Sequence, residues 1–183
     1  MWCIKLVHAD KVGLFLHFKT FEQENDQFLD FGTLGKSRML YYRELIARFG
    51  HHLALCWNLS EEITNTVPQI KQFSDYIKRI DPYQHIVVTH TFPDDTALYN
   101  KLIGYPTFDG PSLQQRPEEV FDLTLLFVEA SATADRKWIV TNDEQNPASD
   151  GVVPDSEDPN HDRIRQYALW GNLMVRPRRA LTC

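Results

Sequence analysis

Carboxylate side chains follow two predicted strands at the point where each strand ends. Glu61 and Glu62 follow one strand, and Asp143 and Glu144 follow another. In parallel α/β folds the carboxyl ends of the strands meet at one edge of the sheet, where active sites gather. Two carboxylates at that edge suit cleavage of a glycosidic bond, because one protonates the leaving oxygen while the other attacks the sugar or activates water.

Alternation along a strand decides which of two neighbouring carboxylates faces the predicted site, since successive side chains point to opposite faces. In the strand predicted over residues 53–59, Glu62 continues the parity of Asn58, so Glu62 is preferred and Glu61 is the substitute. The other parity of this strand is bulky and apolar and is expected to pack under helices: Leu53, Leu55, Trp57 and Leu59.

Side chains alternate between faces along the last predicted strand as well. Glu144 shares the parity of Asn142 and is preferred, with Asp143 as the substitute one position away. Three further polar side chains lie at or near the ends of the other predicted strands: His17, His90 and Gln114.

The elements that must position these residues alternate between strand and helix patterns. Tyr42, Leu45, Ile46 and Phe49 have the spacing of one buried helix face. Further helices are predicted from a capping box at residues 66–69, over 117–134, and around 164–169, and the strands are predicted over residues 13–19, 53–59, 85–90, 112–114 and 137–142.

Strands that alternate with crossover helices predict parallel pairing and an α/β fold. Five strands in 183 residues are too few for a complete eight-stranded barrel, which typically takes about 250 residues. The sequence therefore predicts either an open sheet or an incomplete (β/α)8 TIM barrel.

Composition excludes several classes of partner. The formal net charge of −6 argues against a nucleic-acid-binding surface. The sequence also contains no run of about 18 apolar residues, which a membrane-spanning helix would require. The histidines and the three cysteines show no paired metal-ligand spacing, so no metal is expected. No signal peptide is recognisable in this chain, and the compartment stays open.

Three segments together resemble the apiosidase-like glycoside hydrolase catalytic domains: residues 40–50, LYYRELIARFG, residues 57–62, WNLSEE, and residues 141–145, TNDEQ. The resemblance covers residues 1–174 and implies a retaining TIM-barrel hydrolase of which this chain supplies strands three to seven. It implies Glu62 as the acid/base and Glu144 as the nucleophile, with no cofactor. Residues 175–183 diverge from the family and are treated as a separate tail.

The resemblance also implies a carbohydrate substrate. Side chains expected to bind or shape it are Asn58, Trp57, His90, Gln114, Asn142 and His17. Because strands one, two and eight of a barrel are not recognisable, two hypotheses stay open: a hydrolase fragment that cleaves an oligo- or polysaccharide, and a non-catalytic carbohydrate-binding remnant or inactive truncated product.

Overall fold

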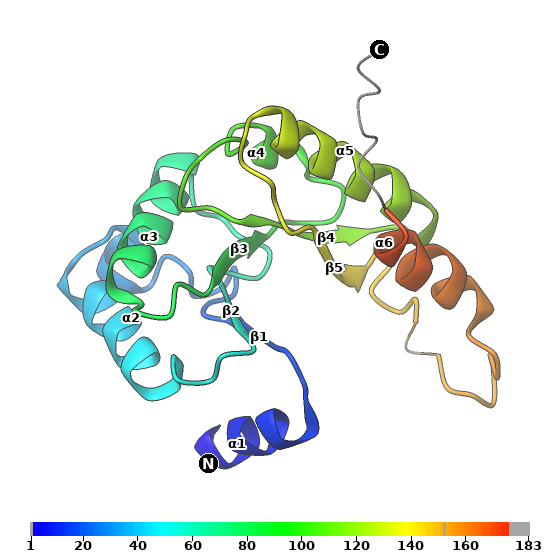
Figure 1. The fold of residues 1–183 in the computed structure, drawn as a ribbon, viewed down its shortest axis with the longest axis horizontal. Coiled ribbons are helices and arrows are strands. Elements are labelled where there is room, and N and C mark those ends of the chain that lie inside the picture. The colour runs from blue at the N-terminus through cyan, green and yellow to red at the C-terminus, as the bar shows by residue number, and fades with distance from the viewer. Residues whose placement is uncertain (1, 152, 176–183) are drawn as a thin grey trace. The chain divides into compact units, whose positions relative to one another are not determined.

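The computed structural model describes residues 2–151 and 153–175, which form two compact units. The first unit takes in the residues up to 90 together with 105–109. The second takes in residues 91–104 and those from 110 onward. Figure 1 traces the elements of both units along the chain.

The first unit contains a three-stranded parallel sheet with β2 in the middle. Its elements are α1 (Trp2–Val12), β1 (Leu16–Lys19), the 3₁₀ helix η1 (Leu29–Gly32), α2 (Lys36–Phe49), β2 (Leu55–Asn58), α3 (Val67–Ile80) and β3 (Ile86–His90). β1 and β3 both run parallel to β2. Because helices α2 and α3 connect the strands, this unit confirms the predicted α/β order.

Helices α2 and α3 form where the periodicity predicts them. Tyr42, Leu45 and Phe49 are buried on one face of α2. The α3 helix begins with the predicted capping box, in which the main-chain N–H of Thr66 donates to the side-chain oxygen of Gln69 at 2.7 Å. Each helix therefore buries an apolar stripe.

The second unit contains a two-stranded parallel sheet. Its elements are α4 (Ala97–Asn100), β4 (Gly110–Gln115), the 3₁₀ helix η2 (Pro117–Glu119), α5 (Val120–Thr133), β5 (Thr141–Gln145), the π-helix η3 (Ile164–Trp170) and α6 (Gly171–Leu173). β4 is buried along its whole length, and α5 connects it to β5, with which it pairs in parallel. The weakest predicted strand, around Ser112–Gln114, is thus present and longer than expected.

Several elements differ from the expectation, among them α4, which lies in a stretch for which no helix was predicted. β5 comprises residues 141–145, whereas the sequence predicted 137–142. Trp138 and Val140 are buried but precede the strand. The apolar pattern of this segment therefore reflects packing of its side chains, whereas the main-chain pairing of β5 begins at Thr141. The α1 helix was not predicted, since its apolar residues do not gather on one face: Leu6 is buried while Ile4 is exposed.

Within the described residues, every helix is too short or too polar to cross a bilayer. The predicted tail, residues 175–183, lies outside the described residues except for its first position.

Candidate active site

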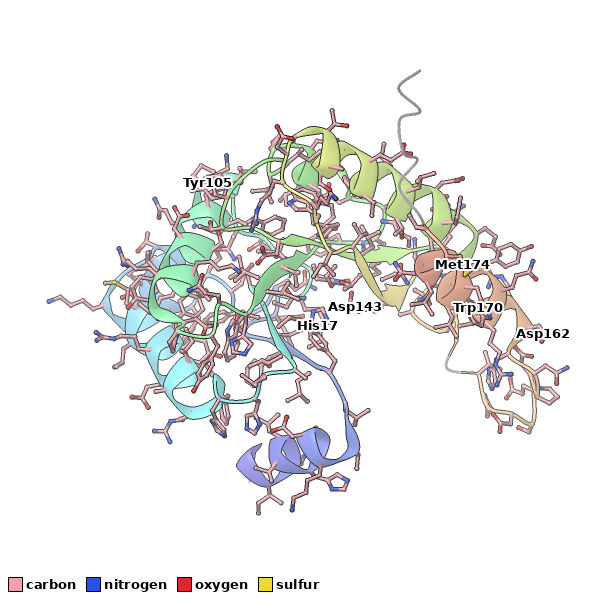
Figure 2. The ribbon with its side chains drawn as sticks, in the orientation of Figure 1. His17, Tyr105, Asp143, Asp162, Trp170 and Met174 are labelled. Atoms are coloured by element: carbon pink, nitrogen blue, oxygen red, sulfur yellow. The ribbon has the colours of Figure 1, made fainter. Side chains whose placement is uncertain are left out.

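Polar side chains gather at the carboxyl ends of β1, β2 and β3 in the first unit. The register aligns His17 with Cys56 and Lys19 with Asn58, so these four side chains lie on one face of the sheet. Asn58 aligns in turn with Val88 on β3, and His90 lies two residues further on, with the same parity as Val88. Figure 2 labels His17, the second residue of β1.

Asn58 is the centre of this group and is fully buried. Its Nδ2 lies 2.8 Å from Nε2 of His17, and its Oδ1 accepts a hydrogen bond from the main-chain N–H of Ser60 at 3.2 Å. Because the amide nitrogen can only donate, Nε2 of His17 accepts, which places the ring proton of a neutral His17 on Nδ1. Asn58 thus fixes the orientation of the imidazole through Nε2.

Lys19 and Glu61 form an ion pair beside this group, with Nζ 2.7 Å from Oε1. Lys19 lies on the same face as His17 and Asn58, so the Glu61 carboxylate reaches that face too. The main chain supports this position, because Glu61 bridges to Glu22 in a parallel arrangement. Glu61 therefore joins the group formed by the strand ends.

Glu62 does not continue the parity of Asn58. β2 ends at Asn58, and the main chain at Glu62 adopts a left-handed conformation with φ of 42°. Alternation of side chains holds only within an extended strand, so the argument that preferred Glu62 does not apply at this position. The geometry of the first unit favours Glu61 over Glu62.

Trp57 lies on the opposite face of β2 from Asn58. Its Nε1 donates to Oδ2 of Asp81 at 3.1 Å, and its ring makes an edge contact with Phe18, with centroids 5.5 Å apart. The indole is 1% exposed. The expected role of Trp57 in the floor of a sugar site does not fit this placement, because the ring packs beneath the helices as its apolar parity predicted.

The second unit places its candidate carboxylates at a β-bulge. The β4–β5 register aligns Leu113 with Asn142 and Gln114 with Glu144, so Asp143 is an extra residue in β5. The hydroxyl of Ser112 donates to Oδ1 of Asp143, and Figure 2 labels Asp143 on this strand. Asp143 and Glu144 therefore both lie on the face of Ser112 and Gln114.

The bulge also separates Asn142 from Glu144. Asn142 aligns with Leu113, which is fully buried on the face opposite Gln114. The predicted common parity of Asn142 and Glu144 is thus interrupted by one residue. Gln114 and Glu144 are brought together, whereas Asn142 lies with the apolar side chains.

Tyr99 anchors β4 from within the second unit. Its hydroxyl donates to the main-chain oxygen of Ser112 at 2.9 Å, and burial raises the pKa of Tyr99 above its ordinary value. The phenol therefore stays a neutral donor and holds the strand beside Asp143. Ser112 and Lys19 were not among the predicted site residues, although each shares a parity with one that was.

A solved structure resembles this fold. The crystal structure of a Bacteroides vulgatus protein provisionally assigned as a glycoside hydrolase superposes with a TM-score of 0.55 at 20% sequence identity. The match covers 76% of this chain but only 27% of that protein. It supports an α/β fold of five parallel strands, consistent with part of a TIM barrel.

No protein-family profile matches the chain, and no curated protein does. The fold is therefore similar to part of a protein provisionally assigned as a glycoside hydrolase, of which this chain spans about a quarter of the length.

Proposed function

We propose that this chain carries the central part of a retaining glycoside hydrolase, with Glu61 as acid/base and Glu144 as nucleophile. The observation that carries the proposal is the placement of one carboxylate after β2 and one on β5, in a fold similar to that of an assigned glycoside hydrolase. The likeness of residues 40–50, 57–62 and 141–145 to the apiosidase-like domains supports the same class of enzyme.

Each proposed carboxylate has neighbours suited to its role. Lys19 holds Glu61 by an ion pair on the face that carries His17, whose imidazole Asn58 orients by a hydrogen bond. Gln114 lies on the same face as Glu144 and offers a further amide. Such a mixture of donors and acceptors suits a carbohydrate.

In the proposed reaction Glu61 protonates the glycosidic oxygen while Glu144 attacks the anomeric carbon, so the C–O bond to the leaving group breaks as the ester to Glu144 forms. A water molecule then gives its proton to Glu61 and cleaves that ester, which returns Glu144 as a carboxylate. Retention requires a separation of about 5–5.5 Å between the two carboxyl groups.

The test compares Glu61→Gln, Glu62→Gln and Glu144→Gln on aryl glycosides with good and poor leaving groups. We expect Glu61→Gln to lower kcat/KM about 10²–10⁴-fold for poor leaving groups and much less for good ones, because a good leaving group needs no protonation. Glu144→Gln should reduce turnover of both substrates to the uncatalysed level.

Glu62→Gln is the matched control, since it removes the adjacent carboxylate. Turnover within about twofold of the unsubstituted chain is expected. Equal turnover by the Glu144→Gln variant and the unsubstituted chain would refute the assigned mechanism. If Glu62→Gln instead shows the leaving-group dependence, the acid/base is Glu62 and the assignment of Glu61 is wrong.

A non-catalytic carbohydrate-binding protein is the second candidate. The observation that favours it is the Lys19–Glu61 ion pair, which engages the carboxylate that a hydrolase would need as its proton donor. Saccharide binding by the unsubstituted chain without turnover of any aryl glycoside would support this candidate over the hydrolase.

A further inference from the structure

A pocket in the second unit lies on the opposite face of β4 from Gln114. It is lined by Asp94, Thr96, Gln115, Arg116, Glu119, Asp122 and Leu123. These residues come from the loop after β3, from the end of β4, and from η2 and the start of α5. Its volume of about 460 Å³ falls within the roughly 300–1,000 Å³ of small-molecule sites.

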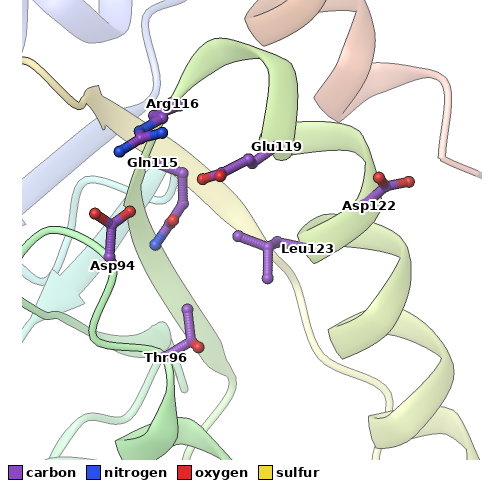
Figure 3. A pocket seen from close by; sticks show the side chains of 7 residues that line it. All are labelled: Asp94, Thr96, Gln115, Arg116, Glu119, Asp122 and Leu123. Atoms are coloured by element: carbon purple, nitrogen blue, oxygen red, sulfur yellow. The ribbon is translucent and has the colours of Figure 1, made fainter.

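Gln115 has a buried side chain that faces this pocket. The residue is 1% exposed, and its Nε2 has no hydrogen-bond partner among the described residues. Figure 3 shows the amide pointing toward the side of the pocket formed by Asp94 and Thr96. A buried amide donor without a partner is costly, which indicates that a ligand atom accepts its hydrogen bond.

Asp94 is oriented toward the same space by its neighbours. Its Oδ2 accepts a hydrogen bond from Nδ2 of Asn146 at 3.0 Å, and the main-chain N–H of Asn146 donates to the oxygen of Gln115 at 3.0 Å. The main chain at Asp94 is left-handed, with φ of 62°. The loop is therefore tied to the end of β4, and Oδ1 of Asp94 remains available to a ligand.

The lining combines acceptors with donors. Asp94, Glu119 and Asp122 accept hydrogen bonds, whereas Arg116 and the amide nitrogen of Gln115 donate them. A cation would leave both donors without partners. In the described residues these three carboxylates also do not bring their oxygens within 4.8 Å of one another, so they do not form a cation site.

We propose that this pocket binds a saccharide unit as a second carbohydrate site on the outer face of β4. Sugar hydroxyls donate to Asp94 and Glu119 and accept from Gln115 and Arg116, while Leu123 contacts the C–H face of the ring. The choice of a saccharide rests on the proposed function. The site itself rests on the buried amide and on the oriented Asp94 carboxylate.

The test titrates the Glu144→Gln chain with trisaccharides of gluco, manno, galacto and xylo configuration, and with a glucosamine trisaccharide. The side-chain NH₂ signals of Gln115, identified with Gln115→Met, report occupancy by NMR. We expect these signals to shift with at least one neutral trisaccharide. Asp94→Asn should raise that Kd about tenfold, because a hydrogen bond to a charged group is lost.

Asp95→Asn is the matched control, since Asp95 is exposed next to Asp94 and does not line the pocket. It should leave the Kd within about twofold. Equal Kd values for the two variants, or an unmoved Gln115 signal throughout, would overturn the proposal. If the Gln115 signals shift with the glucosamine trisaccharide alone, the ligand is a cation and not a neutral saccharide. That result would also overturn the proposal.

Turnover of aryl glycosides by the unsubstituted chain separates this inference from the proposed function. Gln115 shifts in a chain that turns over no glycoside support the second site and refute the hydrolase. Turnover without any shift of the Gln115 signals refutes the second site alone.

Discussion

Asp81 is a buried carboxylate in the first unit that binds several neighbouring groups. It lies at the end of the sheet opposite to the candidate site. Its Oδ2 accepts from the indole of Trp57 at 3.1 Å and faces Nδ1 of His85 at 2.7 Å, and its Oδ1 accepts from the main-chain N–H of Tyr83 at 3.0 Å. Nε2 of His85 faces the main-chain oxygen of His52 at 3.1 Å. Both ring nitrogens of His85 therefore lie within hydrogen-bond distance of an acceptor oxygen.

The lowered pKa of Asp81 predicts that the free energy of unfolding decreases at acidic pH. Burial alone would raise this pKa, but the hydrogen bonds from His85, Trp57 and Tyr83 lower it below the usual value. A depressed folded-state pKa contributes stability above the unfolded pKa of about 3.9, and this contribution is lost as the pH falls through the folded value.

The substitution Asp81→Asn should lower the free energy of unfolding at pH 7 by about 1–3 kcal/mol and flatten its dependence below about pH 4. Urea unfolding at pH 7 and pH 3, followed by tryptophan fluorescence, measures both effects. Asp162→Asn, at an exposed position, serves as the control. An Asp81→Asn variant that loses as much stability between pH 7 and pH 3 as the unsubstituted chain would contradict this prediction.

At the scale of elements, single contacts decide where a helix begins and which way a strand faces. Oε1 of Gln69 closes the capping box of α3, and its Nε2 donates to the main-chain oxygen of Gly32 at 2.8 Å. One side chain thus fixes the start of α3 and ties it to η1. In β5, Asp143 is the extra residue of the bulge, and because of it two consecutive carboxylates lie on one face of the strand.

Replacing Gln69 by Ala should lower the free energy of unfolding by about 1–2 kcal/mol, because a cap and a tertiary hydrogen bond are lost together. Gln72→Ala is the matched control on the exposed face of the same helix and should change stability by less than about 0.5 kcal/mol. Thermal unfolding followed by circular dichroism gives both values. Equal losses in the two variants would show that the capping box is unimportant.

At the scale of the whole molecule, the pairing of the strands leaves free edges. Among the described residues β1 pairs with β2 alone, and β5 pairs with β4 alone. Unpaired main-chain N–H and C=O groups on an edge strand can pair with another chain. A complete barrel removes such edges by closing on itself.

We therefore expect the isolated chain to self-associate as its concentration rises. Light scattering after size exclusion should give an apparent mass above the 21.3 kDa of one chain at high concentration, and a mass that falls on dilution. Thioflavin binding should rise with the mass if the strands pair edge to edge. A constant mass of one chain at all concentrations would contradict this expectation.

Much of the fold follows from local sequence patterns. The apolar spacing of α2 and α3, the capping box at Thr66 and the crossover order of strands and helices all predict what the structure contains. These patterns are reliable because burial of one helix face and satisfaction of helix-end N–H groups depend on residues a few positions apart.

The candidate site depends on tertiary structure at the points where alternation fails. Periodicity alone preferred Glu62, but β2 ends at Asn58, and the left-handed main chain beyond it leaves Glu61 beside Lys19. Likewise, the register between β4 and β5 sets the face of Glu144 through a bulge. The sequence by itself determined the fold class, the helix faces and the strand ends that carry carboxylates. Only the tertiary structure placed Glu61 beside Lys19 and turned both Asp143 and Glu144 to one face, because hydrogen bonds to another strand set where alternation stops.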